Sequence, residues 1–366
     1  MTIKTYEYNP DYAVPPGWVL EDRLATQNIS HAEFARRCGR SPKLISEIIS
    51  GKAPIEPRTA IQFESVLGVD AGIWLGIEKD YRLHLEREAE TRRAEESIAW
   101  AKRFPIAELV KRGVFEQPKS NADKVKTVLS FFGVASVDAW HIQQKSMRVA
   151  YRHSPTFKSG EEALATWLRL GEMEAGLVDC PDYSEAGFKN ALSQIRDLTA
   201  AKTAESILQA QMLCRESGVV LAIVKPLPKT ALSGATRWIN PRKALIQLSA
   251  RHLSDDHLWF SFFHEAAHIL LHSKRDVFVH ESKGEATEAD IEADEWASDF
   301  LISPAAWGQF EGCGVFTKRI IVDFAYEQGI APGIVVGRLQ HEGLISWRSR
   351  LNSLKTPLAW SEDTKS

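Results

Sequence analysis

The sequence predicts a mainly helical protein with one small β-sheet, an α+β fold distributed over more than one domain. Apolar residues recur at helical spacing through most of the chain, whereas residues 218–249 hold a β-branched run followed by a hairpin pattern. The length of 366 residues is too great for one ordinary hydrophobic core. The predicted segments are an N-terminal five-helix bundle (1–77), a charged linker helix (78–104), a helical region of unassigned role (105–204), a helix-and-sheet domain (205–311) and a C-terminal helical extension (312–366).

Composition and charge are those of an ordinary globular protein. The formal net charge is −3, so any affinity for DNA has to come from a local concentration of basic side chains. No apolar run is as long as a membrane span, and the polar N-terminus lacks the apolar core of a secretion signal. We therefore expect a soluble, cytoplasmic protein without a membrane partner. The widely spaced cysteines argue against a disulfide framework or a thiolate metal site; they are Cys38, Cys180, Cys214 and Cys313.

Capping signals predict two short helices within residues 29–52. Ser30 followed by Glu33 predicts the start of the first helix, and Ser41 followed by Pro42 predicts the start of the second. A glycine-containing turn separates them, and a further glycine ends the second. Two short helices joined in this way form the geometry that places a second helix in the major groove of DNA.

The second of these helices has one apolar and one polar side. Its apolar stripe consists of Leu44, Ile45, Ile48 and Ile49. Between His31 and Arg58 there are six Lys or Arg against three Asp or Glu, so the segment is locally basic. A helical bundle that binds no DNA remains the alternative. The side chains that we predict to contact DNA are Arg40, Ser41, Lys43, Ser46, Glu47, Ser50 and Lys52.

Residues 15–69 closely resemble the helix-turn-helix family of the XRE/Cro type, and within it the antitoxins of the HigA type. The resemblance includes the Gly-Lys pair after the second helix and the Pro-Arg-Thr-Ala sequence that starts the next one. It implies binding to double-stranded operator DNA. It also implies a homodimer on an inverted repeat.

The sequence F-F-H-E-A-A-H contains the motif H-E-x-x-H in a helical, apolar context. His264 and His268 are one helical turn apart, so both imidazoles lie on one face and can bind one Zn2+ ion. Glu265 can then accept a proton from a metal-bound water, and we predict it as the catalytic residue. A third protein ligand is required, and the spacing leaves several carboxylates of residues 287–304 open: Glu288, Glu292, Asp294 and Glu295.

Residues 205–310 resemble the ImmA/IrrE family of metallopeptidases. Residues 292–297, Glu-Ala-Asp-Glu-Trp-Ala, match the family's helix that follows the H-E-x-x-H motif, and Pro304 follows as it does in the family. The resemblance implies a zincin-like fold and identifies Glu292 as the third metal ligand, with Glu295 as the fallback. It assigns His272 a positioning or structural role. His257 and His280 have no partner at ligand spacing, so we expect them on the surface or in loops.

These signals lead to alternative hypotheses. The first is an antitoxin-like DNA-binding transcriptional regulator whose zinc-dependent endopeptidase domain cleaves a protein, either another regulator or itself. The second is a non-enzymatic repressor or antitoxin whose peptidase-like domain binds a toxin or a ligand. A third is that the chain is itself a toxin. The tail, residues 317–347, predicts two further helices; we expect core packing for them rather than a second DNA-contacting unit, because the second helix is apolar.

Overall fold

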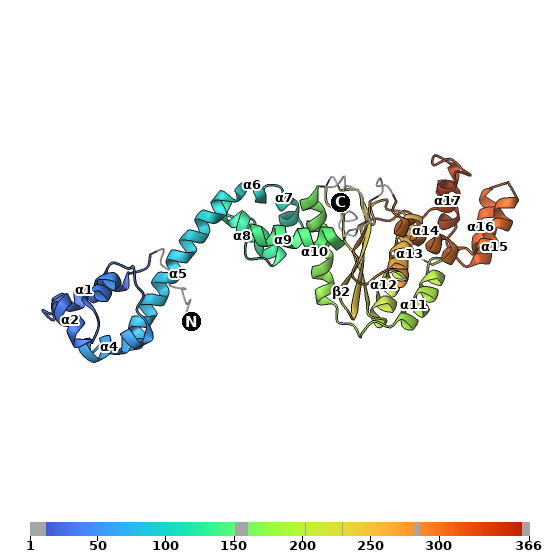
Figure 1. Ribbon diagram of the computed structural model, residues 1–366. Coiled ribbons are helices and arrows are strands. Elements are labelled where there is room, and N and C mark those ends of the chain that lie inside the picture. Colours follow the sequence, from blue (N-terminus) through green and yellow to red (C-terminus); the bar gives the residue numbers. More distant parts are fainter. Residues whose placement is uncertain (1–11, 151–159, 202, 229, 282–285, 361–366) are drawn as a thin grey trace, which may run out of the picture. The chain divides into compact units, whose positions relative to one another are not determined.

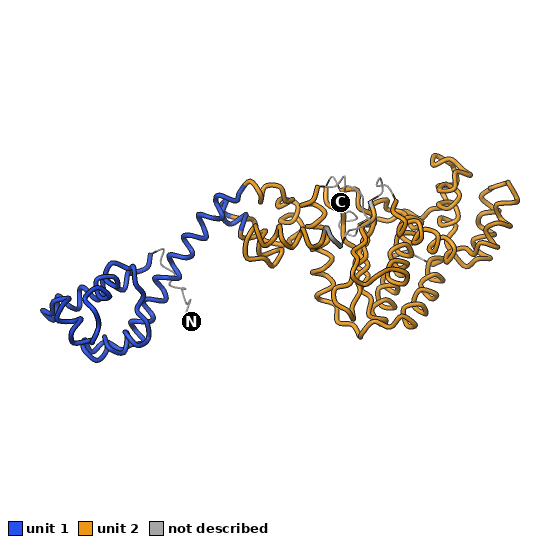
Figure 2. Tube along the Cα trace, viewed as in Figure 1, with its two compact units in different colours: residues 1–98, 119–125 blue, residues 99–118, 126–366 orange. Residues whose placement is uncertain are grey.

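The structure of the protein is a computed structural model. Its contacts divide the chain into two compact units, residues 1–98 with 119–125 and residues 99–118 with 126–366 (Figures 1 and 2). The structure describes residues 12–150, 160–201, 203–228, 230–281 and 286–360. The chain is mostly helical with one small mixed sheet, so the predicted α+β class is confirmed.

The first unit is a helical bundle. Leu20, Phe34, Ile45 and Phe63 are among the side chains of its core, and the Phe34 and Phe63 rings pack 4.9 Å apart. Helix α1 begins at a proline, which suits the first helical position. The described helices of this bundle are α1 (Pro16–Thr26), α2 (His31–Arg37), α3 (Pro42–Ile49), α4 (Pro57–Leu67) and α5 (Ala71–Glu96).

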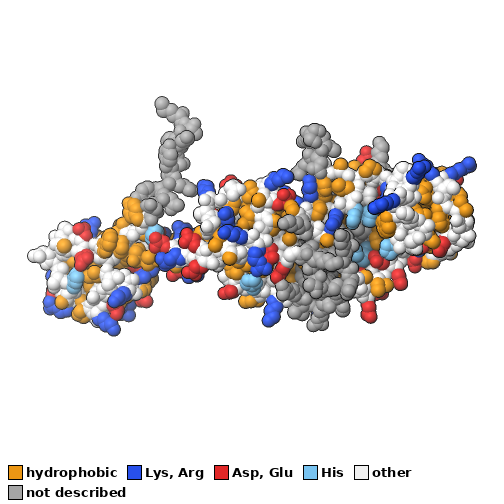
Figure 3. Space-filling model, turned by 90° about the horizontal axis from the view of Figure 1, so that it is seen from above, with side chains coloured by type: hydrophobic (Ala, Val, Ile, Leu, Met, Phe, Trp, Pro, Cys, Tyr) orange, Lys and Arg blue, Asp and Glu red, His pale blue; other side chains and the backbone are white. Residues whose placement is uncertain are grey.

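Residues 78–96 of the charged segment predicted as a separate linker helix (78–104) form the second part of α5. That helix runs without a break from Ala71 to Glu96, so the predicted boundary at residue 77 falls inside it. This part of the helix carries acidic and basic side chains that form ion pairs three or four residues apart. In one of them Arg82 Nε lies 2.7 Å from Glu78 Oε1. Acidic and basic side chains accordingly lie beside one another on the face visible in Figure 3.

Several short helices follow α5 along the chain. An aromatic cluster packs among them, in which Trp100, Phe104, Phe132 and Trp140 have ring centroids 4.8–5.9 Å apart, mostly edge to face. This region therefore has a hydrophobic cluster of its own. The helices are α6 (Ile98–Ala101), α7 (Ile106–Lys111), α8 (Asn121–Phe132) and α9 (Val137–Ala150).

The sheet of the second unit has the order β1-β3-β2-β4, with β1 and β3 parallel and the other pairs antiparallel. The predicted buried strand is β1, and the predicted hairpin is β2–β3, in which Asn240 pairs with Lys243. Both predictions are confirmed. The strands are β1 (Val219–Ile223), β2 (Leu232–Asn240), β3 (Lys243–Leu248) and β4 (Phe278–Glu281).

Helices cover both faces of this sheet. Helix α10 (Glu161–Leu177) lies on one face, where Gln247 of β3 donates to the carbonyl of Trp167 at 2.6 Å. Gly171 allows this approach, because a Cβ atom there would lie 2.0 Å from the Gln247 side chain. On the other face α12 and α13 pack against the strands, and α11 packs against α12 (Figure 1). The remaining helices near the sheet are α11 (Glu185–Leu198), α12 (Thr203–Glu216), α13 (Asp255–Leu271) and α14 (Glu288–Leu301).

The C-terminal region adds helices to the same core. The two predicted tail helices are α16 and α17, and the buried residues of α17 include Ile334, Val335 and Leu339, as their apolar character predicts. Across the described residues no single helix has the length and apolarity to cross a membrane, although the pair α16 and α17, bent by 112°, meets both criteria together. The elements are α15 (Pro304–Gly312), α16 (Lys318–Gln328), α17 (Pro332–His341) and the 3-10 helix η1 (Arg350–Leu354).

Candidate metal centre and nucleic-acid interface

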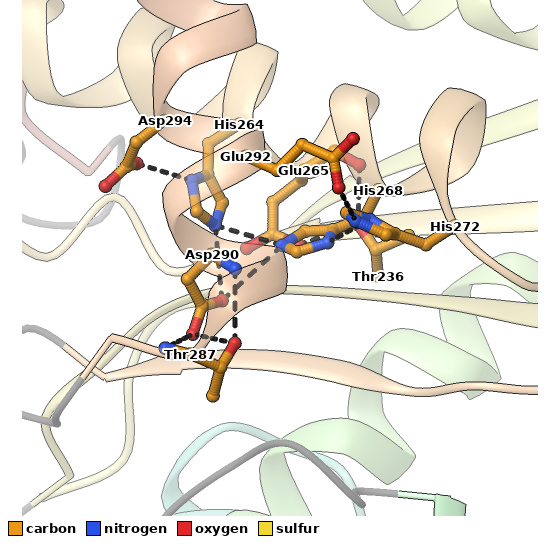
Figure 4. A network of polar contacts seen from close by, with 9 residues as sticks. All are labelled: Thr236, His264, Glu265, His268, His272, Thr287, Asp290, Glu292 and Asp294. Atoms are coloured by element: carbon orange, nitrogen blue, oxygen red, sulfur yellow. Dashed lines mark hydrogen bonds and ion pairs between the residues drawn. The ribbon is translucent and has the colours of Figure 1, made fainter.

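The H-E-x-x-H residues lie on α13, as predicted, and their side chains are buried. His264 and His268 are each 2% exposed, and Glu265 is 1% exposed. The two histidines direct their Nε2 atoms toward each other at 3.1 Å (Figure 4). Two nitrogens on one tetrahedral zinc at about 2.0 Å would lie about 3.3 Å apart. The pair is therefore spaced for a shared metal ion.

Hydrogen bonds on the Nδ1 side fix the orientation of both imidazoles. His264 Nδ1 lies 2.7 Å from Asp294 Oδ1, and His268 Nδ1 lies 3.0 Å from His272 Nδ1. A metal-binding histidine is normally held in this way through its other ring nitrogen, and a carboxylate partner increases its basicity. Asp294, which the sequence offered as a ligand, thus lies at Nδ1 of His264, on the side of the ring away from the Nε2 pair.

Asp290 is the carboxylate of α14 that faces the Nε2 atoms. Its Oδ1 lies 3.8 Å from His264 Nε2 and 3.6 Å from His268 Nε2. Its second oxygen accepts from the backbone N–H of Thr287 at 2.9 Å and from the Thr287 hydroxyl at 2.8 Å. The bond from the Thr287 N–H and the reciprocal bond from the Asp290 N–H to the Thr287 hydroxyl form a capping box at the start of α14, so the residues that begin the helix also position this carboxylate.

Glu292 lies elsewhere. Its Oε2 is 3.1 Å from His272 Nε2, and its side chain is 61% exposed. Glu288 and Glu295 are exposed on the same helix. The assignment of Glu292 as a ligand stays a prediction, while the geometry brings Asp290 to the histidines. Sequence reasoning passed over Asp290, although its position three residues after a threonine, and four before Asp294, marked it as a capping residue on the same helical face.

His280 is a second residue that sequence reasoning missed. It lies on β4, and its ring centroid is 4.8 Å from that of His264. Potential ligand atoms of His264, His280 and Asp290 lie within 4.8 Å of one another. The strand that carries His280 is placed near α13 because it pairs with β2. No local sequence pattern reveals this pairing.

The catalytic candidate Glu265 is held against β2. The Thr236 hydroxyl donates to Glu265 Oε2 at 2.7 Å. Gly234 leaves room for the carboxylate, because a Cβ atom there would lie 2.3 Å from Glu265 Oε1. Burial raises the pKa of Glu265 to about 7, which suits a group that accepts and returns a proton near neutral pH.

The protonation preferences of the two histidines differ. Burial, with the neighbouring His264 and His272, holds the pKa of His268 far below its usual range, so this imidazole is neutral. Burial also lowers the pKa of His264, but the hydrogen bond to Asp294 and the charge of Glu265 outweigh it, and the net shift is upward. Two imidazoles with an adjoining carboxylate form a donor set that fits Zn2+.

The first unit presents α3 as its second helix-turn-helix element. Ser41 caps this helix by accepting from the Leu44 N–H at 3.2 Å. In the preceding helix Ser30 accepts from the Glu33 N–H, but the Glu33 carboxylate pairs with Arg36 and Arg37 rather than closing a capping box. The predicted contact residues that are exposed are Ser41, Lys43, Ser46, Ser50 and Lys52.

Arg40 and Glu47 are partly buried. Arg40 Nε donates to the Gln62 side chain at 2.6 Å, and Glu47 lies 3.8 Å from Lys43 Nζ. The lack of a side chain at Gly17 allows α1 to approach the end of α3 closely, because a Cβ atom there would lie 2.1 Å from the Ile49 carbonyl oxygen. The polar side of α3 is thus presented on a packed helical bundle. Its contacts with DNA stay predictions.

Two families match this chain. Residues 20–74 match the helix-turn-helix family, and residues 214–306 match the IrrE N-terminal-like domain of the M78 peptidases. The uncharacterized HTH-type transcriptional regulator YddM of Escherichia coli (strain K12) is 32% identical over 68 residues, which cover 19% of this chain and 72% of that protein.

Solved structures also resemble the N-terminal part. A putative antidote protein of a plasmid maintenance system from Nostoc punctiforme is 28% identical, with a TM-score of 0.23, over 23% of this chain and 92% of that one. A Pseudomonas aeruginosa protein crystallised with its 18-bp operator DNA is 25% identical, with a TM-score of 0.21, over 21% and 85% of the respective chains. From its sequence matches, the chain belongs to the HTH-type transcriptional regulators and joins their DNA-binding domain to an M78 peptidase-like domain.

Proposed function

We propose that this regulator is antitoxin-like and that its C-terminal domain is a zinc-dependent endopeptidase. The observation that carries the proposal is the pair of Nε2 atoms of His264 and His268, 3.1 Å apart, with Asp290 within 3.8 Å and Glu265 next to them on α13. This is the arrangement of ligands and base that metal-assisted hydrolysis requires.

Zinc, when bound, supplies a Lewis acid and lowers the pKa of a coordinated water to about 7. His264, His268 and Asp290 would hold it. Glu265 accepts the proton of the attacking water at its carboxylate and later returns it to the leaving amine. Thr236 keeps the Glu265 carboxylate in place, and Asp294 keeps the proton of His264 on Nδ1, so that Nε2 faces the metal.

The proposed substrate is a protein, either another regulator or this chain itself. DNA binding and hydrolysis in one molecule would allow cleavage to end repression. The antitoxin-like character rests on the resemblance of residues 15–69 to HigA-type antitoxins. Through this bundle we also propose a homodimer on an inverted-repeat operator.

Elemental analysis tests the metal centre. We expect one zinc per chain in the purified protein and none in Asp290→Asn, which keeps the size but loses the charge of the ligand. Glu292→Gln is the matched control on the same helix, and it should retain zinc because its partner is the outer residue His272. The opposite pattern would assign the third ligand to Glu292. A wild-type protein without zinc would refute the peptidase proposal.

A non-enzymatic repressor or antitoxin that binds a toxin is the second candidate. Burial of Glu265 at 1% exposure and its bond to Thr236 favour it, since a buried, hydrogen-bonded carboxylate can serve structure alone. Glu265→Gln distinguishes the two. We expect the variant to keep zinc and DNA binding but to lose the ability to cleave proteins that are co-expressed with it. Mass spectrometry of the co-expressed proteins measures the cleavage. If neither the wild type nor the variant cleaves a co-expressed protein and both regulate equally, the second candidate stands; equal cleavage by both would exclude Glu265 as the catalytic base.

A further inference from the structure

A cavity separate from the metal centre lies between α13, α14, α17 and the segment that follows α17. Its volume is about 110 Å³. Phe260 and His257 of α13, Leu301 of α14, His341 of α17 and Trp347 contribute to its walls. This volume is smaller than that of the engineered apolar cavity of about 150 Å³ that binds benzene, but the cavity is open on one side, so a flat ring can enter it with one edge left in solvent.

The walls are arranged for stacking. The rings of His257 and Trp347 are within 16° of parallel, with centroids 6.5 Å apart, and His252 stacks on His257 at 4.3 Å. A flat ring held between His257 and Trp347 needs about 7 Å, twice the usual carbon–carbon contact distance of about 3.5 Å, so the exposed Trp347 ring would have to move outward by about 0.5 Å to admit it. On α17, His341 lies 6.4 Å from the ring of Phe260. Aromatic surfaces thus approach the cavity from three segments of the chain.

The charges around the cavity are paired within the protein. Asp256 accepts from Lys355 Nζ at 2.6 Å. Arg338 pairs with Glu342 at 2.9 Å and donates to the carbonyl of Ser298 at 3.0 Å. Burial lowers the pKa of His257, so its imidazole is neutral and can both donate and accept. These features favour a neutral ligand with hydrogen-bonding edges, because the charges of Asp256, Arg338 and Glu342 at the wall already have partners within the protein.

From these walls and charges we propose that the cavity binds a neutral, planar nitrogen heterocycle of the size of a nucleobase. The cavity adjoins the helices that build the metal centre. Phe260 lies one helical turn before His264 on α13, and Ser298 lies one turn after Asp294 on α14. The occupant would therefore contact the same helices that carry the metal ligands. The site does not depend on whether the metal centre is catalytic.

Uracil is the probe for this proposal, with 5,6-dihydrouracil as the matched control. The two share their hydrogen-bonding groups, but dihydrouracil lacks the flat aromatic ring. Binding to the full-length protein would be followed by saturation-transfer NMR up to about 10 mM, a range suited to fragments. We expect uracil to bind about fivefold to tenfold more tightly than its control.

Variants locate the binding. Trp347→Ala and His341→Ala should each weaken uracil binding about tenfold. Trp347 is 56% exposed, so its loss should not unfold the protein, and circular dichroism checks this. Trp18→Ala, with a tryptophan 67% exposed in the other unit, should have no effect. The double variant His264→Ala, His268→Ala should still bind. The proposal would be overturned if the wild type did not bind uracil, or if neither cavity variant weakened uracil binding. It would also be overturned if the double variant no longer bound uracil.

Discussion

Gly234 shows how one residue without a side chain shapes the metal centre. A Cβ atom at this position would lie 2.3 Å from Glu265 Oε1, and Glu265 is already fixed by Thr236. The glycine therefore sets where the carboxylate lies, although it bears no functional group.

Gly234→Ala should displace Glu265 and destabilise the protein by about 1–3 kcal/mol, the usual cost of overpacking. Chemical unfolding measures the change. Gly76→Ala on α5 is the control, because no described atom outside its own helix lies within 4 Å of an added Cβ, and a helical Gly→Ala change should stabilise by about 0.5–1 kcal/mol. Equal stabilities of Gly234→Ala and wild type would contradict the contact.

Asp294 contacts His264 at Nδ1, on the side of the ring away from the Nε2 atom proposed to bind the metal. Asp294→Asn should keep the fold but weaken zinc binding about 10-fold to 100-fold, because an amide oxygen holds the imidazole N–H less strongly. Competition with a zinc chelator measures the affinity. Glu295→Gln, an exposed neighbour on α14, should leave it unchanged, and a loss there instead would revive Glu295 as the fallback ligand.

At the scale of elements, α3 carries the DNA-binding prediction. Its apolar stripe is confirmed, with Ile45 and Ile48 fully buried, and this leaves Lys43 and Ser46 exposed on the other side. Sequence predicted both helix starts of this motif, because a cap and the helix period act within a few residues.

Lys43→Ala should weaken DNA binding about equally across sequences and reduce the salt dependence of binding by about one charge. Ser46→Ala should instead change sequence preference. Both are measured on duplexes selected by the wild-type protein from a random library. Lys79→Ala, a change on the long helix α5, is the control. If Lys43→Ala and Lys79→Ala had equal effects, α3 would not be the recognition helix.

At the scale of the whole molecule, the two units have separate hydrophobic cores. Zinc would bind within the second unit alone, because the residues that would hold it lie on α13 and α14. A ligand stabilises the folded state to which it binds, so its removal should affect that unit selectively.

Removal of zinc with EDTA should lower the melting temperature of one calorimetric transition and leave the other in place. The first unit's transition is identified by Gly17→Ala, which should shift only that one, since the added Cβ would clash with Ile49. Added zinc should reverse the EDTA effect. A downward shift of both transitions by EDTA would contradict independent units.

Features that depend on neighbours along the chain could be predicted from the sequence. Caps and apolar periodicity predicted α3 and the metal-motif helix α13, and β-branched runs with an Asn-Pro turn predicted β1 and the β2–β3 hairpin. The resemblances added the two domains, which the family matches support.

The contacts between side chains of different elements became known from the tertiary structure alone. Whether Asp290 or Glu292 faces the histidines depends on how α14 is rotated against α13, and carboxylates two residues apart lie on different sides of a helix. The approach of His280 depends on the pairing of β4 with β2, and the place of Glu265 depends on the absence of a side chain at Gly234. Packing and strand register act between residues far apart in sequence, so no local pattern records them.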